Sequence, residues 1–73
     1  MTTYYSLTEA LKDADKVKIL DLSSQQLTDL PAEFGQLIQL QVLNLYQNRF
    51  PLFPDVIPDL TSLRQLHLDN NFG

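Results

Sequence analysis

Leucine recurs at a fixed interval of 23 residues along most of this chain. From residue 17 the sequence divides into the rows VKILDLSSQQLTDLPAEFGQLIQ, LQVLNLYQNRFPLFPDVIPDLTS and LRQLHLDNNFG. Seven or more columns agree in residue type, and 15 of the 73 residues are leucine, roughly twice the usual share. A period of this length is typical of proteins that stack one supersecondary unit on the next.

Each row contains one short segment in which apolar and polar residues alternate, namely ILDLS, VLNLY and QLHLD. This alternation predicts a short β-strand with its leucines on one face. Because the spacing between rows is constant, we expect successive strands to lie parallel and in register, about 4.8 Å apart. The leucines predicted to fill the interior from the strands are Leu20, Leu22, Leu43, Leu45, Leu66 and Leu68.

The segments between the strands predict return paths on the opposite side of each coil. Pro31 and Pro54 fix φ and prevent a strand ladder there. The apolar spacing that follows favours a short helical or 3₁₀ turn whose side chains fill the interior from the second side. The residues with this spacing are Leu30, Phe34 and Leu37 in the first unit and Phe53, Ile57 and Leu60 in the second.

An amide side chain occupies the same column of each row, as Gln25, Asn48 and Asn71. Backbone groups become buried without a ladder partner where the strand ends, and an inward-pointing amide can satisfy them. We therefore predict a structural role for Asn48, bonding to its own coil and to the neighbouring one. The longer Gln25 side chain predicts a different turn in the first unit.

The pattern resembles the leucine-rich repeat family, whose L-x-x-L-x-L-x-x-N-x-L core stands here as LQVLNLYQNRF (40–50) and VKILDLSSQQL (17–27). The resemblance covers residues 17–73 and implies an α/β fold. This fold is a right-handed solenoid with short parallel strands on a concave face and 3₁₀ or irregular returns on the convex side. The predicted units are 17–39, 40–62 and a partial unit, 63–73.

Residues 1–16 lie outside the repeat and predict an N-terminal capping helix. Ser6-Leu7-Thr8-Glu9 has the form of a capping box, with Ser6 as the N-cap and Glu9 reaching back. One helical face would then carry Leu7, Ala10, Leu11 and Ala14. We expect two to three turns that cover the open end of the first coil.

Composition excludes several classes of function. Nine acidic and five basic residues give a net charge of −4, which does not suit nucleic acid or an anionic membrane surface. The absence of cysteine excludes disulfides and thiolate metal sites. Neither a signal sequence nor an apolar run of about 18 residues is evident, so we predict a cytoplasmic protein.

The outward strand positions form a surface that we call the concave face. Its predicted binding residues are Ile19, Asp21, Val42, Asn44, Tyr46, His67 and Asp69. Tyr46 has the amphipathic character common in binding hot spots, and a rigid sheet lowers the entropic cost of association. Together with the family's commonest role, this predicts a non-catalytic module that binds a protein partner.

Catalysis and metal binding are disfavoured on the same surface. The row formed by Asp21, Asn44 and His67 places the carboxylate and the imidazole two strands, or about 9.6 Å, apart and open to water. A metal site needs three or four converging ligands, and the face offers His67 with Asp69. We therefore predict no enzyme activity, no catalytic residues, no metal and no cofactor.

Other hypotheses stay open because the third unit stops halfway. Gly73 stands where the family has a closing leucine, which would leave Phe50, Leu66, Leu68 and Phe72 near an open end. The chain could be a structural unit that self-associates through this end as a homo-oligomer, or a fragment of a longer repeat protein. It could also be stable alone, with DNNFG (69–73) folded over the core.

The second return is unusually apolar. Pro51, Leu52 and Val56 stand where the first unit has Thr28, Asp29 and Glu33. This loop either packs back on itself or joins an interface.

Overall fold

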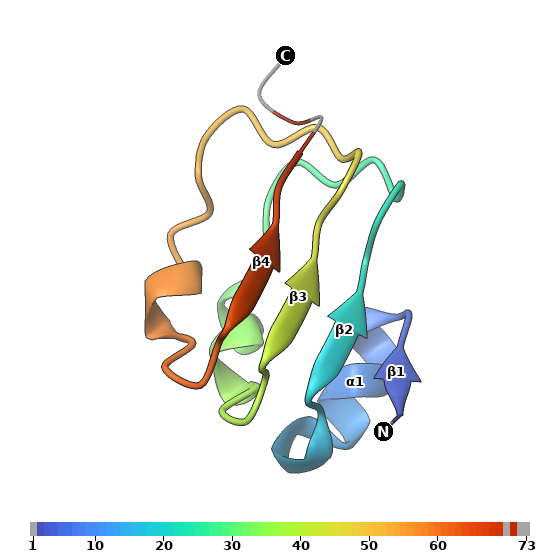
Figure 1. The fold of residues 1–73 in the computed structure, drawn as a ribbon, viewed down its shortest axis with the longest axis vertical. Coiled ribbons are helices and arrows are strands. Elements are labelled where there is room, and N and C mark those ends of the chain that lie inside the picture. The colour runs from blue at the N-terminus through green and yellow to red at the C-terminus, as the bar shows by residue number, and fades with distance from the viewer. Residues whose placement is uncertain (1, 70, 72–73) are drawn as a thin grey trace.

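The computed structural model describes residues 2–69 and 71, and their strands form one sheet (Figure 1). The strands are β1 (Thr3–Tyr4), β2 (Ile19–Asp21), β3 (Val42–Asn44) and β4 (Gln65–His67), in the spatial order β1-β2-β3-β4. The described residues also form one α-helix, α1 (Leu7–Lys12). They form three 3₁₀ helices: η1 (Ala14–Lys16), η2 (Ala32–Gln36) and η3 (Ile57–Asp59). All neighbouring strands are parallel.

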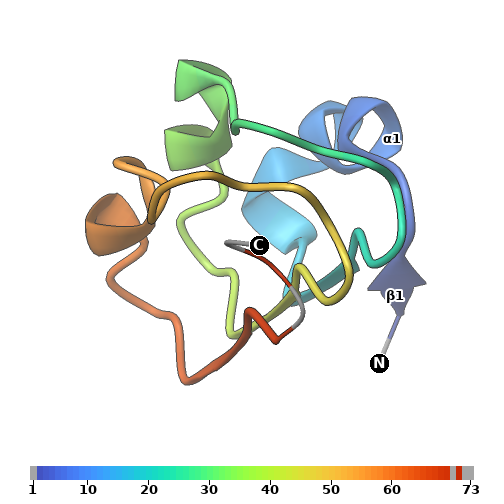
Figure 2. The ribbon, with the colours of Figure 1, turned by 90° about the horizontal axis from the view of Figure 1, so that it is seen from above.

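The register of the sheet confirms the prediction drawn from the 23-residue period. Leu20 lies opposite Leu43, and Leu43 lies opposite Leu66. The returns of the two full units run side by side toward η2 and η3, as the view from above shows (Figure 2). A backbone hydrogen bond of 2.8 Å from the Arg49 N–H to the Leu27 carbonyl joins these returns.

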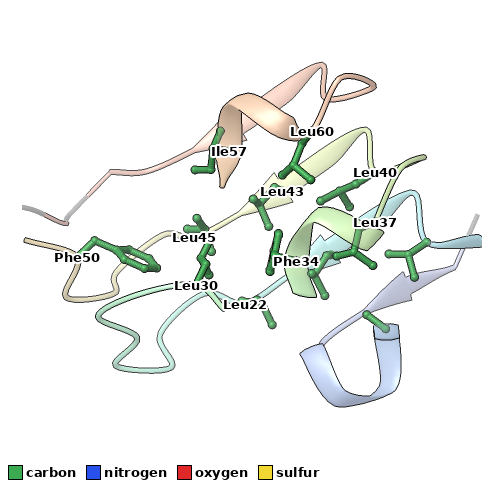
Figure 3. Packing of buried hydrophobic residues seen from close by; sticks show 13 residues of the cluster. Leu22, Leu30, Phe34, Leu37, Leu40, Leu43, Leu45, Phe50, Ile57 and Leu60 are labelled. Atoms are coloured by element: carbon green, nitrogen blue, oxygen red, sulfur yellow. The ribbon is translucent and has the colours of Figure 1, made fainter. Parts of the chain in front are cut away.

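The core lies between the sheet and the returns (Figure 3). Leucines of β2 and β3, and those that follow each strand, meet side chains from η2 and η3. The most buried side chains are Phe34, Phe50, Leu20, Leu22, Leu37, Leu40, Leu43, Leu45 and Val17. Leu66 and Leu68 are half-buried.

The N-terminal segment contributes a strand that the sequence pattern does not reveal. In β1, Thr3 lies opposite Ile19 and Tyr4 lies opposite Leu20. The Tyr4 side chain packs against the core, and its hydroxyl donates a hydrogen bond of 3.0 Å to Asp13 Oδ2. That hydrogen bond, with partial desolvation and the Asp13 charge, raises the pKa of Tyr4. Tyr5, the next residue, is exposed.

Helix α1 begins at the predicted N-cap but is shorter than the predicted two to three turns. Ser6 Oγ accepts a hydrogen bond of 3.4 Å from the Glu9 N–H. The Glu9 carboxylate lies 2.9 Å from Lys12 Nζ instead of reaching back to Ser6, and this hydrogen bond raises the pKa of Lys12. The helix ends because the Asp13 N–H bonds to the carbonyl of Ala10, three residues back, and the chain tightens into η1.

The second return differs from its prediction. Phe53 was expected in the core beside Ile57 and Leu60, but 51% of its surface is exposed, whereas the equivalent Leu30 is buried. Phe50 is fully buried in the same unit and belongs to the core cluster (Figure 3). Leu52 and Phe53 are exposed, whereas Val56 of the same loop is half-buried and packs against the core.

The predictions that concern Phe72, Gly73 and the folding of DNNFG over the core involve residues outside the described part of the chain.

Candidate functional site

The concave face is built from side chains that strand alternation directs away from the core. The sheet register places Ile19 opposite Val42, and Val42 opposite Gln65. One strand position further on, Asp21 lies opposite Asn44, and Asn44 lies opposite His67. The sheet therefore brings the predicted strand residues of this face into two continuous rows.

Exposure increases across the face from β2 toward β4. Ile19, Asp21, Val42 and Asn44 are half-buried, because neighbouring strands flank them on both sides. Tyr46, which follows β3, is 37% exposed. His67 and Asp69, on and after the edge strand β4, are exposed as well.

Two residues of the face have a second role that the sequence analysis missed. Asp21 Oδ1 accepts a hydrogen bond of 3.0 Å from the Ser23 N–H, and Asn44 Oδ1 accepts one of 2.9 Å from the Tyr46 N–H. Each side chain thus holds the backbone two residues ahead of it. The signal was available in the sequence, since Asp and Asn stand at the end of a strand and just before a turn.

The Tyr46 backbone is fixed by partners on two sides. Its N–H is held by Asn44, and its carbonyl accepts a hydrogen bond of 2.8 Å from the Ser24 N–H of the preceding coil. Ser24 Oγ also donates to Gln47 Oε1 at 2.9 Å. The aromatic side chain therefore projects from a backbone that hydrogen bonds hold in place on two sides.

Asn48 ties two coils together below this face. Only 5% of its surface is exposed. Its Oδ1 accepts hydrogen bonds of 3.0 Å from the N–H groups of both Gln25 and Leu27. Its Nδ2 donates to the carbonyl oxygens of Leu22 at 2.9 Å and Leu45 at 3.0 Å. One side chain therefore satisfies backbone groups of its own coil and of the preceding one.

Asn71 repeats this arrangement one coil later. Its Nδ2 donates to the carbonyl oxygens of Leu45 and Leu68 at 2.8 and 2.9 Å, and its Oδ1 accepts from the Phe50 N–H at 3.3 Å. The two asparagines form a ladder of amides that fixes the ends of β2, β3 and β4.

The first unit turns differently at its amide position. Gln25 is exposed, and its Nε2 donates a hydrogen bond of 3.0 Å to the Tyr5 carbonyl. Ser24 and the equivalent Gln47 both adopt a positive φ, and the first unit adds a further positive φ at Gln26, which the equivalent Arg49 of the second unit does not have. The glutamine side chain thus joins the first coil to the N-terminal segment.

The described residues show little of the geometry that catalysis or metal binding needs. Asp21 and His67 lie on β2 and β4 with β3 between them. Among residues 2–69 and 71, no three side chains of His, Asp or Glu gather in a way that would hold a metal ion. Within the same residues, no helix has the length and apolar character needed to cross a bilayer.

Comparison with known proteins agrees with this geometry. A family model described as "Leucine rich repeat" matches residues 15–71. The chain belongs to the leucine-rich repeat family. A solved leucine-rich repeat protein of Leptospira interrogans superimposes on it with a TM-score of 0.66 and 31% sequence identity. That match covers 97% of this domain and 24% of the Leptospira chain.

Two curated relatives extend the comparison of this leucine-rich repeat domain. The Dictyostelium discoideum protein named probable inactive serine/threonine-protein kinase roco10 is 38% identical over 68 residues, covering 90% of this chain and 3% of the relative. Mouse leucine-rich repeat and calponin homology domain-containing protein 1 is 39% identical over 51 residues, covering 70% of this chain and 7% of the relative. The chain therefore spans a small fraction of the length of both relatives.

Membership of this family carries a general functional meaning. Leucine-rich repeat domains are typically protein-interaction modules, and the fold is generally not enzymatic.

Proposed function

We propose that this leucine-rich repeat domain binds a partner protein through its concave face. The observation that carries the proposal is the fixed backbone behind that face. Sheet hydrogen bonds, the turn contacts of Asp21 and Asn44 and the amide of Asn48 all hold it in place. A preorganised surface loses little conformational entropy on binding, so more of the contact energy appears as affinity.

The side chains of the face suit a protein partner. Ile19 and Val42 provide a half-buried apolar pair, and Tyr46 offers an aromatic ring with a polar end. His67 and Asp69 add polar and charged groups toward the open side of the sheet. An apolar centre with a polar rim is the usual composition of a protein interface. Asp21 and Asn44 complete the proposed contact set and also shape the turns.

We expect Tyr46→Ala to weaken partner binding by roughly tenfold or more, because a centrally placed tyrosine is a typical hot spot. Lys18→Ala, just before β2, should change the affinity little and serves as the control. The partner would be isolated by affinity capture and its dissociation constant measured by calorimetry, with both variants first checked for unchanged melting. A larger loss for Lys18→Ala than for Tyr46→Ala would contradict binding at the concave face.

A second candidate function is self-association through β4. In the described part of the chain β4 pairs with β3 alone, and Leu66 and Leu68 are only half-buried, whereas the equivalent Leu43 and Leu45 are fully buried. An unpaired strand edge next to apolar side chains is a template for pairing with another copy. In a longer repeat protein the next coil would occupy the same edge.

Sedimentation equilibrium at micromolar concentration tests the second candidate. Self-association predicts a mass that rises with concentration above the 8.4 kDa of one chain. A single species at the monomer mass, with a cooperative melting transition, would rule out this function.

A further inference from the structure

The second return exposes two large apolar side chains where the first return exposes an aspartate and buries a leucine. Leu52 is 78% exposed and Phe53 is 51% exposed, although both are large apolar residues. The equivalent positions of the first unit hold Asp29, which is exposed, and Leu30, which is buried. Two adjacent apolar side chains in water contribute little to the fold, so their exposure calls for another explanation.

A groove runs beside these side chains, between the first and second returns. One depression of roughly 260 Å³ is lined by Leu52, Phe53, Asp29 and Asp55, among others. A second, of roughly 310 Å³, is lined by Asp29, Asp55, Asp59 and apolar groups that include Val56. Asp29 and Asp55 line both depressions, so the two adjoin. We call the two depressions together the groove, and Leu52 and Phe53 its apolar lip.

The groove is strongly acidic. Its lining includes three aspartates, Asp29, Asp55 and Asp59, and no lysine or arginine among the residues that the structure describes. The Asp29 carboxylate is held in place, since its Oδ1 accepts a hydrogen bond of 2.8 Å from the Leu30 N–H. The ion pair found in the described part of the chain, Lys12 with Glu9, lies in α1, outside this lining.

The apolar lip is preorganised by its flanking prolines. Pro51 precedes Leu52, and Pro54 follows Phe53. Each proline restricts its own φ and the conformation of the residue before it. Pro54 is also buried, which anchors the end of this short loop to the core. The exposed pair therefore loses less freedom on binding than a flexible loop would.

We propose that this groove docks a short segment of a partner protein in which a lysine or arginine lies next to a bulky apolar residue. The apolar side chain packs against Leu52 and Phe53, and the cation lies near Asp29 and Asp55. The acidic lining favours a cation by charge complementarity. It also disfavours a second copy of this chain, because facing grooves would bring like charges together and the whole chain carries a charge of −4.

The test is a selection from a phage-displayed library of random peptides about twelve residues long, a length that can span such a groove. The full chain is the immobilised target, and the selected peptides are the probes for affinity measurements. We expect them to combine Lys or Arg with Phe, Leu or Trp. The double variant Leu52→Ser, Phe53→Ser should lower their affinity at least about tenfold.

Asp55→Asn is the second variant, because it keeps the shape of the side chain and removes its charge. It should weaken the selected peptides by about threefold and reduce the salt dependence of binding. Ile38→Ser is the matched control for the Leu52, Phe53 double variant. Ile38 is also an exposed apolar residue, at 61%, but it lies outside the groove, so its replacement should leave peptide affinity unchanged. Far-UV circular dichroism would verify that each variant is folded.

Several results would overturn the proposal. These are a selection that yields no groove-dependent peptide, enrichment of acidic peptides, and full binding to the Leu52, Phe53 double variant. Self-association of the native chain that this double variant abolishes would identify a second copy as the occupant instead. Peptides that lose binding with Tyr46→Ala alone would support the concave face and contradict the groove, so the two proposals fail separately.

Discussion

Asn48→Ala is expected to lower the free energy of unfolding by about 3 kcal/mol or more. The substitution removes hydrogen bonds to five backbone groups, the N–H groups of Gln25 and Leu27 and the carbonyls of Leu22, Leu45 and Tyr46. A buried polar group left without a partner costs about 1 to 3 kcal/mol. A domain of this size has only roughly 4 to 10 kcal/mol of stability in total. Urea unfolding followed by circular dichroism measures the change.

Gln36→Ala is the matched control for this substitution. Gln36 is also an amide residue, but it is exposed at the end of η2, and its loss should change stability by less than about 0.5 kcal/mol. If Asn48→Ala cost no more than this control, the amide ladder would not be a source of stability.

Phe34→Ala is expected to cost about 4 kcal/mol. Phe34 is fully buried in η2 and lies within the core cluster, between the sheet and the returns (Figure 3). Removing a buried aromatic ring loses its transfer free energy and leaves a cavity, for which losses of about 3 to 5 kcal/mol are typical. The same urea experiment would report this loss.

Phe53→Ala provides a control with the same chemical change. Because Phe53 is half-exposed beside Leu52, we expect a loss below about 1 kcal/mol. Similar losses for the two variants would mean that Phe53 contributes to the core in solution, contrary to the structure of the second return.

The strand register could be predicted from the sequence because it depends on spacing alone. A constant interval between alternating segments leaves one parallel arrangement that buries Leu20, Leu43 and Leu66 together. The outward rows of the concave face follow from the same alternation. Their positions were therefore predictable, whereas their role in binding stays a prediction.

Other features could not be predicted from periodicity. Strand β1 is two residues long, which is too short to show a period. It forms by pairing with β2 at the edge of the sheet. The exposure of Phe53 does not follow from its column, because the equivalent Leu30 is buried. The groove depends on two returns lying side by side, so no single segment of the sequence contains it.

Within the described residues, each strand pairs only with the strands directly beside it in the sequence. A duplicate of residues 40–62, inserted after residue 62, would thus form the same strand pairs and core contacts with the coils on either side of it. The length of this domain can be varied in whole coils, each adding one strand and one amide, without redesigning the interior already present.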